Sequence, residues 1–566
     1  MKELIHSKKQ LTVSIIFGLM ILAGITLCIP FVDNIAIHYI ELFFHKTLRD
    51  PARWIDVLQH SSKLCIFILC LIYFFAYIKK GIEIRGLINQ RILEIKDKHY
   101  AKQTLHIFAG LCVFLFIVYF NIITANYFYA DDVFRNYGGN RSWIGFSRYI
   151  SEFFSIFIHN NLKLNDIAPF TQFISIVISA FTILLLSIAL TDEINVKNCL
   201  ALSIIFIAPF YAENISYRFD CLYMTMALFF SAIPFLFIEN KKSFISISII
   251  SLLLTCCSYQ AALPIYILCT IYLFAKKTIR NEDTKQNWNF ALQAVISFVI
   301  ALVLFKLLFM NKMSNTSDDY FSTKISISAI IPNTINYLKT TFTLNGGILS
   351  KLLFIVSIFL LFINLLKKSN KILNTILVII LIPFSYILSF GPYLVFERTL
   401  FAPRALIGFN VFIALLLLAN LKLSEKLFNK FAVITTVLSV YTCIIFMFTY
   451  GNCLKNQKDY EDFRVSLILN DLSEVSSANN NYNISIKNDI GLTEKNRIAV
   501  RNYPLIKKLI SSRPSDGHIW NEEILNGYNF NCTAENRELT DDFILIKQTY
   551  YHDIYQNGNN FIVVLN

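Results

Sequence analysis

Two neighbouring carboxylates, Asp131 and Asp132, directly follow an apolar run over about residues 104–128. They fall where the hydrocarbon of a bilayer would give way to water, and a charge there is costly unless it is paired or used. A carboxylate at this boundary can accept a proton from a reacting hydroxyl. We therefore predict that Asp131 and Asp132 are catalytic. The alternative is that they cap the helical stretch that follows, as acids do at helix N-termini.

The loop that begins with this pair continues to about residue 169 and contains further polar groups. Arg135 and Arg141 follow the aspartates, and residues 142–164 alternate aromatic and polar side chains with helical spacing. That pattern is typical of a helix lying in the membrane interface. A carboxylate beside such a helix can meet a lipid head group and a water-borne acceptor together, which favours transfer of a group from a lipid.

A second polar turn, from Glu213 to Asp220, separates two apolar runs and also contains Tyr217 and Arg218. A connection between two membrane spans does not need so many polar groups. Two interpretations stay open. Either Arg218 and Asp220 form a local ion pair that ties the turn, or the turn contributes to a binding site.

Three more cations, Lys306, Arg398 and Arg404, stand at predicted outer helix ends. Arginine suits phosphate because its planar fork donates hydrogen bonds in pairs. Snorkelling of a lysine and interfacial anchoring by an arginine are the ordinary alternatives. Tyr259 and Gln260 interrupt another apolar run at its outer tip, where a buried amide would need partners. The alternative there is a simple turn.

Membrane helices must position these groups. Of the 566 residues, 55% are hydrophobic and only 16% are charged, whereas soluble domains carry about 25% charge. Apolar runs long enough for spans recur along the chain, and the longest is divided by polar residues and by Pro264, which makes about 13 predicted spans. The runs cover about residues 11–31, 64–78, 104–128, 170–190, 199–215, 221–238, 243–275, 288–311, 352–366, 372–394, 405–421 and 431–450.

Lysine and arginine placement predicts the orientation, because these residues accumulate in cytoplasmic loops. The basic loops all fall on one side if the N-terminus is cytoplasmic, so the loops with the candidate residues and the tail from Gly451 fall outside. The basic loops lie near residues 8–9, 79–98, 241–242, 276–280, 367–368 and 422–430. We predict an all-α polytopic membrane domain over residues 1–450 and a small extracytoplasmic α/β domain over 451–566.

The tail is polar and has the mixed pattern of a globular domain. We predict helices near residues 460–472 and 504–510 and strands at 482–486, 543–546 and 561–565, the last two joined through Asn557-Gly558. Nothing in the tail has catalytic spacing. Cys453 and Cys532 could form a disulfide if the tail faces an oxidising compartment.

Charge and motif content exclude several functions. The net charge is +13, but the positive excess lies in the apolar part and no basic tract is dense enough for nucleic acid. The histidines have no metal-ligand spacing, and the chain has neither a phosphate-cradling glycine loop nor a serine nucleophile motif. These absences disfavour a nucleotide-dependent cytoplasmic reaction.

Four short motifs resemble a known family. They are the aromatic-Ala-Asp-Asp of residues 129–132, the turn at 213–220, Tyr259-Gln260-Ala261-Ala262 and Pro403-Arg404-Ala405. Together they resemble the O-antigen-modifying, serotype-converting glucosyltransferases of the glucosyl transferase type II family. The resemblance covers about residues 100–420, and the tail carries no matching motif.

The resemblance implies a GT-C type glycosyltransferase of the bacterial inner membrane. Such enzymes take a sugar, here glucose, from undecaprenyl phosphate on the periplasmic face and place it on a lipid-linked O-antigen repeat. A carboxylate of the first large outer loop is the expected general base, which coincides with Asp131 and Asp132. An inverting displacement of this kind requires no cofactor, although an acidic pair could hold a divalent cation weakly.

Two other functions stay open from the residues alone. An O-antigen polymerase or ligase would join whole saccharide repeats, and a lipid-linked saccharide transporter or flippase would move them. A transporter tends to place charges or broken helices near the bilayer midplane, whereas here the polar groups gather at predicted outer helix ends. A non-catalytic scaffold gives no reason for the paired aspartates.

Overall fold

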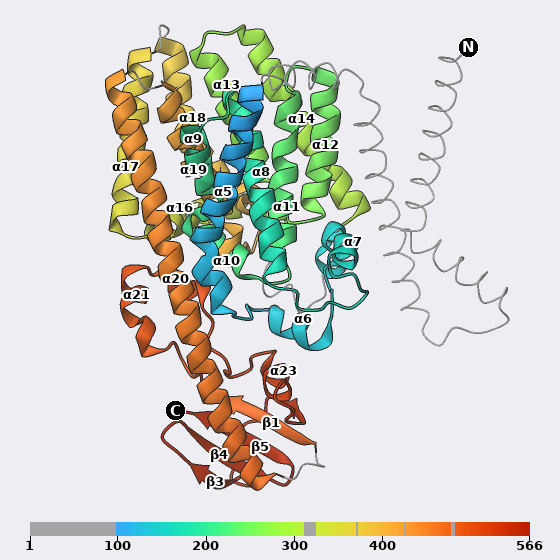
Figure 1. Ribbon diagram of the computed structural model, residues 1–566. Coiled ribbons are helices and arrows are strands. Elements are labelled where there is room, and N and C mark those ends of the chain that lie inside the picture. The colour runs from blue at the N-terminus through green and yellow to red at the C-terminus, as the bar shows by residue number, and fades with distance from the viewer. Residues whose placement is uncertain (1–97, 311–323, 369–371, 424–425, 477–480) are drawn as a thin grey trace, which may run out of the picture.

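The computed structural model describes residues 98–310, 324–368, 372–423, 426–476 and 481–566. Within them the fold is a helical bundle with a small sheet unit at one end (Figure 1). The predicted spans at 11–31 and 64–78, and the predicted cytoplasmic N-terminus, lie outside the described residues.

Six described helices are long and apolar enough to cross a membrane. A seventh span results if α9 (Val196–Ile207) and the segment Pro209–Ser216 are one span, bent by 50°. Four shorter apolar helices accompany them, so the prediction of about 13 spans is not confirmed. The six are α5 (Lys98–Ala125), α8 (Phe170–Thr191), α13 (Pro264–Ile279) with the short turn before it, α14 (Thr284–Leu308), α17 (Ile348–Lys368) and α20 (Lys426–Val475).

The remaining elements of the bundle are shorter. They are α6 (Asp132–Gly138), α7 (Tyr149–Ile158), α10 (Ala212–Ser216), α11 (Cys221–Ala232), α12 (Lys241–Cys256), α16 (Ile330–Leu344), α18 (Ile372–Leu388), α19 (Ile407–Leu423) and the 3-10 turns η1 (Ile144–Phe146), η2 (Pro209–Tyr211), η3 (Ile233–Phe237), η4 (Gln260–Ala262), η5 (Ile327–Ala329), η6 (Gly391–Val395) and η7 (Pro403–Ala405).

Burial divides the bundle into inner and outer helices. All of α19 up to Leu418 is buried, and so is all of α9 from Ala201. In contrast, α14 and α17 expose large apolar side chains such as Leu307 and Phe359. Exposed apolar faces on long helices are what lipid contact requires, since backbone polar groups are already bonded within each helix.

Helices break at the end of the bundle where the candidate residues lie. The long run at 243–275 is split as predicted, into α12 and α13, with η4 between them. Pro264 begins α13, where a missing N–H costs nothing. Similarly, α9 ends before Pro209, and η2 and α10 lead into the turn at residues 217–220. Such breaks put polar turns inside the protein.

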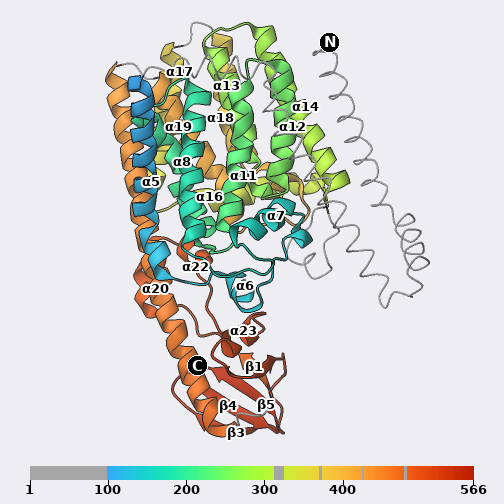
Figure 2. The ribbon, with the colours of Figure 1, turned by 45° about the vertical axis from the view of Figure 1, so that its right-hand side comes forward.

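Lys276 and Lys422, from two of the predicted basic loops, lie at the same end of the bundle (Figure 1). At one end, Lys276 Nζ lies 3.1 Å from Asp192 and Lys422 Nζ lies 2.7 Å from Glu193. Figures 1 and 2 show α6, α7 and the sheet unit together at the opposite end. The predicted separation of Lys276 and Lys422 from the candidate residues is therefore present in the fold.

The sheet unit is joined to the bundle by a continuous helix. α20 is 50 residues long and passes through Gly451 without a break, so the boundary predicted at residue 450 falls inside a helix. The predicted strands are present, and β4 lies between the last two, so that the Asn557-Gly558 turn joins β4 to β5. The sheet order is β2 (Cys532–Ala534), β1 (Tyr482–Lys487), β5 (Asn560–Leu565), β4 (His552–Asn557) and β3 (Ile544–Gln548).

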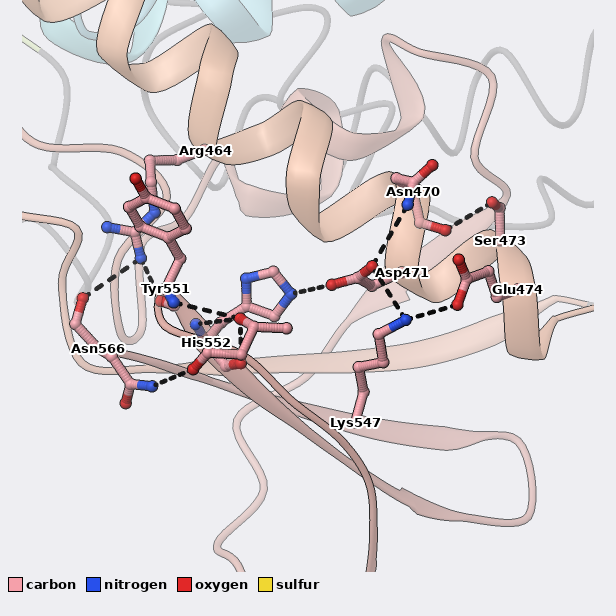
Figure 3. Close-up of polar contacts among 10 residues, drawn as sticks. Arg464, Asn470, Asp471, Ser473, Glu474, Lys547, Tyr551, His552 and Asn566 are labelled. Carbon is pink, nitrogen blue, oxygen red and sulfur yellow. Dashed lines mark hydrogen bonds and ion pairs between the residues drawn. The ribbon is translucent and has the colours of Figure 1, made fainter.

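A buried polar cluster attaches the end of α20 to this sheet. His552 Nε2 on β4 lies 3.0 Å from Asp471 Oδ2 on α20, and Lys547 on β3 donates to Glu474. Arg464 reaches the backbone carbonyl of Tyr551 (Figure 3). Because buried polar groups need partners, this cluster fixes the helix on the sheet.

The other short helices of the tail are α21 (Arg497–Asn502), α22 (Leu505–Leu509) and α23 (Asn521–Asn526); α22 confirms the helix predicted near 504–510. Cys453 and Cys532 are both free thiols. Cys453 packs in the core of the bundle, and Cys532 packs in the separate core of the sheet unit. The predicted disulfide is therefore wrong, because the two residues belong to different cores.

Candidate active site

The turn between α5 and α6 carries the aspartate pair. Asn126 and Ala130 both have positive φ, 51° and 44°, a conformation that costs energy for residues with a Cβ and that clusters at functional sites. Asp131 immediately precedes α6, but its side chain makes no capping hydrogen bond. The capping alternative is therefore wrong for Asp131.

Asp132 is fully buried and ties three backbone segments together. Its Oδ2 accepts hydrogen bonds from the backbone N–H of Tyr129 (3.0 Å) and of Arg218 (2.9 Å), and its Oδ1 accepts one from Phe219 (3.3 Å). Burial raises the pKa of Asp132 to about 8, against the lowering effect of these N–H donors. Asp132 thus joins the start of α6 to the second polar turn.

Asp131 is only partly buried. Its carboxylate forms neither a hydrogen bond nor an ion pair with any described residue, and its charge acts on the buried phenol of Tyr217. The two aspartates therefore differ. The carboxylate of Asp132 is fully engaged by backbone hydrogen bonds, whereas the carboxylate of Asp131 is available to a ligand.

Arg135 on α6 pairs with Asp220, with Nε 3.2 Å from Oδ2, and its guanidinium lies 4.1 Å from the centre of the Trp143 ring. The indole N–H of Trp143 donates to the same Asp220. Since Asp220 takes Arg135 as its partner, the predicted local pair between Arg218 and Asp220 is wrong.

Arg218 instead pairs with Asp166, a residue that precedes α8. The same guanidinium also donates to Asn126 and lies 4.4 Å from the centre of the Phe128 ring. Through Arg218, the strained turn before Asp131 is thus fixed to the loop before α8. Sequence reasoning missed Asp166, although an acid at the end of the same outer loop was a signal for it.

Glu213 and Arg404 form the second buried contact of the site. The carboxylate of Glu213 accepts from the guanidinium of Arg404 and, at 2.7 Å, from its backbone N–H. Tyr217 lies beside this pair, with its ring centre 5.9 Å from the Arg404 guanidinium carbon and 4.9 Å from the ring centre of Tyr129. The hydroxyl of Tyr259 donates to the Arg404 carbonyl at 3.0 Å. Two turns far apart in the chain therefore meet.

The other predicted residues lie around this centre or away from it. Arg141 Nε pairs with Glu152 at 2.9 Å, and Gln260 donates to the Phe146 carbonyl at 3.2 Å. Lys306 is exposed near the end of α14, and its side chain makes no hydrogen bond or ion pair with any described residue. Arg398 is exposed in the loop after η6. Arg141 and Gln260 thus contact the outer loop that follows the aspartates, whereas no contact places Lys306 or Arg398 beside the aspartates.

The tail also reaches the site, which the sequence did not indicate. Arg513 is buried and donates to the Phe128 carbonyl at 2.6 Å, and it lies 3.7 Å from Glu461 on α20. Trp520 stacks on Phe134 of α6, with ring centres 4.7 Å apart. The C-terminal unit therefore contacts the turn that carries Asp131 and the helix α6 that follows it.

No three His, Cys, Asp or Glu side chains come together as metal ligands within the described parts of the chain. The site is thus a set of acid–arginine pairs surrounded by tyrosine and tryptophan rings, with one available carboxylate. Acids and aromatic side chains of this kind can bind a saccharide and accept a proton from its hydroxyl.

Comparison with known proteins decides the family. Residues 120–415, more than half of the chain, match the family described as glucosyl transferase GtrII. The chain belongs to this glucosyltransferase family. The matched segment begins just before the Asp131 turn and ends after Arg404, so it covers every contact of the site except those from the tail.

A curated relative from Salmonella phage P22, named as an uncharacterised 55.3 kDa protein in the gtrB 5′ region, is 24% identical over 486 residues. The alignment covers 80% of this chain and 95% of that protein. No solved structure matches the chain. The predicted resemblance to serotype-converting glucosyltransferases is confirmed.

Proposed function

We propose that this glucosyltransferase moves a glucosyl residue from undecaprenyl phosphate-glucose to a lipid-linked O-antigen repeat. The observation that carries the proposal is that the unpaired carboxylate of Asp131 and the Glu213–Arg404 ion pair both act on the buried Tyr217, at the end of the bundle opposite Lys276 and Lys422. By the distribution of basic residues, that end faces the periplasm of a bacterial inner membrane. Both substrates are lipid-linked and reach it within the membrane.

The proposed reaction is a single inverting displacement. The oxygen of an acceptor hydroxyl attacks the anomeric carbon of the glucosyl group, and its proton passes to the carboxylate of Asp131. The bond from the anomeric carbon to the phosphate oxygen breaks, and its electron pair leaves with the phosphate. General base catalysis typically contributes about 10²- to 10⁴-fold to such a rate.

The other predicted residues then have distinct roles. Asp132 positions the base, because it holds the start of α6 on the backbone of Arg218. Arg135 forms an ion pair with Asp220, and Arg218 forms one with Asp166. Both pairs stabilise the outer loop that follows Asp131. Glu213, Tyr217, Tyr259 and Arg404 line the centre where the sugar would bind. The leaving phosphate needs charge stabilisation more than an acid. The proposed displacement uses no cofactor.

The test is transfer by purified Asp131→Asn and Asp132→Asn proteins, with Asp192→Asn at the opposite end of the bundle as the matched control. We expect Asp131→Asn to lower kcat by about 10²- to 10⁴-fold without loss of folding. Asp132→Asn should lower thermal stability as well, and the control should transfer at the normal rate. Normal transfer by the Asp131 variant would remove the proposed base.

The product identifies the reaction class. Mass spectrometry of the lipid-linked saccharide should show a single-hexose increment. A change in the number of whole repeats would instead indicate a polymerase or ligase, and movement of an unchanged saccharide across the membrane would indicate a transporter.

A further inference from the structure

One arginine at the site differs from the others in having no carboxylate partner. Arg135, Arg141, Arg218 and Arg404 each pair with a carboxylate. Arg148, just before α7, pairs with none among the described residues, and its Nε is buried without a hydrogen-bond partner. A buried guanidinium nitrogen without an acceptor is costly, so an anionic ligand would offset this cost.

The position of Arg148 is fixed by its neighbours. The backbone N–H of Ile150 donates to the Cys257 carbonyl at 3.0 Å, and Gln260 donates to the Phe146 carbonyl. The guanidinium carbon of Arg148 lies 5.0 Å from the centre of the Tyr259 ring and 5.3 Å from that of Phe146. Arg148 is therefore held against the turn between α12 and α13.

A chain of contacts links Arg148 to the proposed base. Tyr259 lies under Arg148 and donates to the backbone of Arg404. Arg404 lies beside Tyr217, on which the charge of Asp131 acts. Because Glu213 neutralises Arg404, Arg148 supplies the uncompensated positive charge of this neighbourhood. The acid stands at one end of the chain of contacts and the unpaired cation at the other.

We propose that Arg148 binds the phosphate of the polyprenyl donor and of the polyprenyl phosphate that leaves. This assignment rests on the proposed function. The donor phosphodiester carries one negative charge, and the leaving monophosphate gains the electron pair of the broken bond, so the cation is needed most as the bond breaks. A guanidinium also donates to phosphate oxygens in pairs.

The experiment measures the affinity of purified Arg148→Gln for undecaprenyl phosphate, with Arg280→Gln, an exposed arginine at the opposite end, as control. We expect the Kd of the Arg148 variant to rise by about 10- to 100-fold, as loss of a charge-assisted contact implies. The KM for the donor should rise with it, whereas the KM for the acceptor should not. Wild-type affinity in a folded Arg148→Gln protein would overturn the assignment.

A second variant covers the case in which Arg148→Gln does not fold. Arg148→Lys keeps the charge but cannot donate as a planar pair, so we expect its Kd for undecaprenyl phosphate to rise by about 3- to 10-fold. Affinity equal to that of the wild type would again contradict the role of Arg148.

The binding and transfer assays separate the two proposals. If the wild-type protein binds undecaprenyl phosphate through Arg148 but transfers no sugar, the phosphate site stands and the proposed function fails. If the wild type transfers glucose and Arg148→Gln binds and transfers equally well, the function stands and the phosphate site fails.

Discussion

Asp131 and Asp132 are neighbours in the chain, yet their carboxylates have different surroundings. One accepts three backbone hydrogen bonds in a fully buried position, and the other is partly exposed without a hydrogen bond to the described residues. The difference follows from the start of α6, where successive side chains point in different directions around the helix axis. A tandem pair of acids at a helix start thus supplies one carboxylate for structural contacts and one that stays available to a ligand.

Burial of Asp132 predicts a pH dependence of stability. Its pKa is raised from 3.8 to about 8 by burial, so between these values the folded protein holds a proton that the unfolded chain releases. The stabilising contribution of this group is full below about pH 4, declines as pH rises and is lost above about pH 8. We expect the Tm of the wild type in detergent to fall over this range more steeply than that of Asp132→Asn. Parallel Tm curves for the two proteins would contradict this assignment.

At the scale of elements, the bundle depends on close helix crossings. α20 crosses α5 at Gly451, where an added Cβ would lie 2.6 Å from the backbone carbon of Asn121. The same crossing carries a hydrogen bond from Asn121 to Asn452 at 2.9 Å. Small residues at such positions let helix backbones approach closely in membranes. Gly451 therefore allows one helix to serve both the bundle and the C-terminal unit.

Replacing this glycine should separate the two helices. We expect Gly451→Ala to destabilise the protein by about 1–3 kcal/mol, because the methyl group overlaps the backbone of α5. Gly110→Ala on α5 is the matched control, since an added Cβ there meets nothing within 4 Å; it should be neutral or slightly stabilising. Thermal unfolding in the same detergent compares the two. Equal Tm values would show that α5 and α20 do not need this close approach.

At the scale of the whole molecule, the C-terminal unit and the membrane bundle share the site. Tyr127 donates to Glu461 on α20 at 3.0 Å, and its ring centre lies 4.9 Å from the guanidinium carbon of Arg513. Arg513 in turn donates to the carbonyl of Phe128. Because these contacts surround the turn that leads to Asp131, the tail takes part in positioning the proposed base.

Replacing Arg513 should lower both the stability and the transfer rate, and a second substitution should restore only the stability. Arg513→Met leaves Glu461 buried without its cation, which typically costs about 3–5 kcal/mol, and it also removes the contact to Phe128. Adding Glu461→Gln should restore most of the Tm but not the transfer rate, because the turn stays unanchored. Thermal unfolding and glucose transfer by the single and double variants measure both. A double variant with the normal transfer rate would remove the positioning role of Arg513.

Much of the architecture follows from local pattern. Apolar runs predict membrane helices because each backbone polar group in lipid must bond within its own segment, and Pro264 predicts the break between α12 and α13 because proline cannot continue a helix from the preceding turn. Period-two alternation predicts the strand at 482–486, and a short continuous apolar run rich in β-branched residues predicts the strand at 561–565.

Pairing and burial depend on distance in space, which local pattern does not contain. Arg218 binds Asp166, 52 positions away, instead of nearby Asp220, and Arg404 binds Glu213, 191 positions away. Only the tertiary structure makes Asp132 a buried contact and Asp131 an available carboxylate, leaves Arg148 without an acidic partner, and places Arg513 of the tail against the turn that leads to Asp131. The sequence alone therefore indicated where membrane helices and candidate polar residues lie, because both follow from local pattern. The tertiary structure decided which charged side chains form pairs and which stay available to a ligand, because these contacts join residues far apart in the chain.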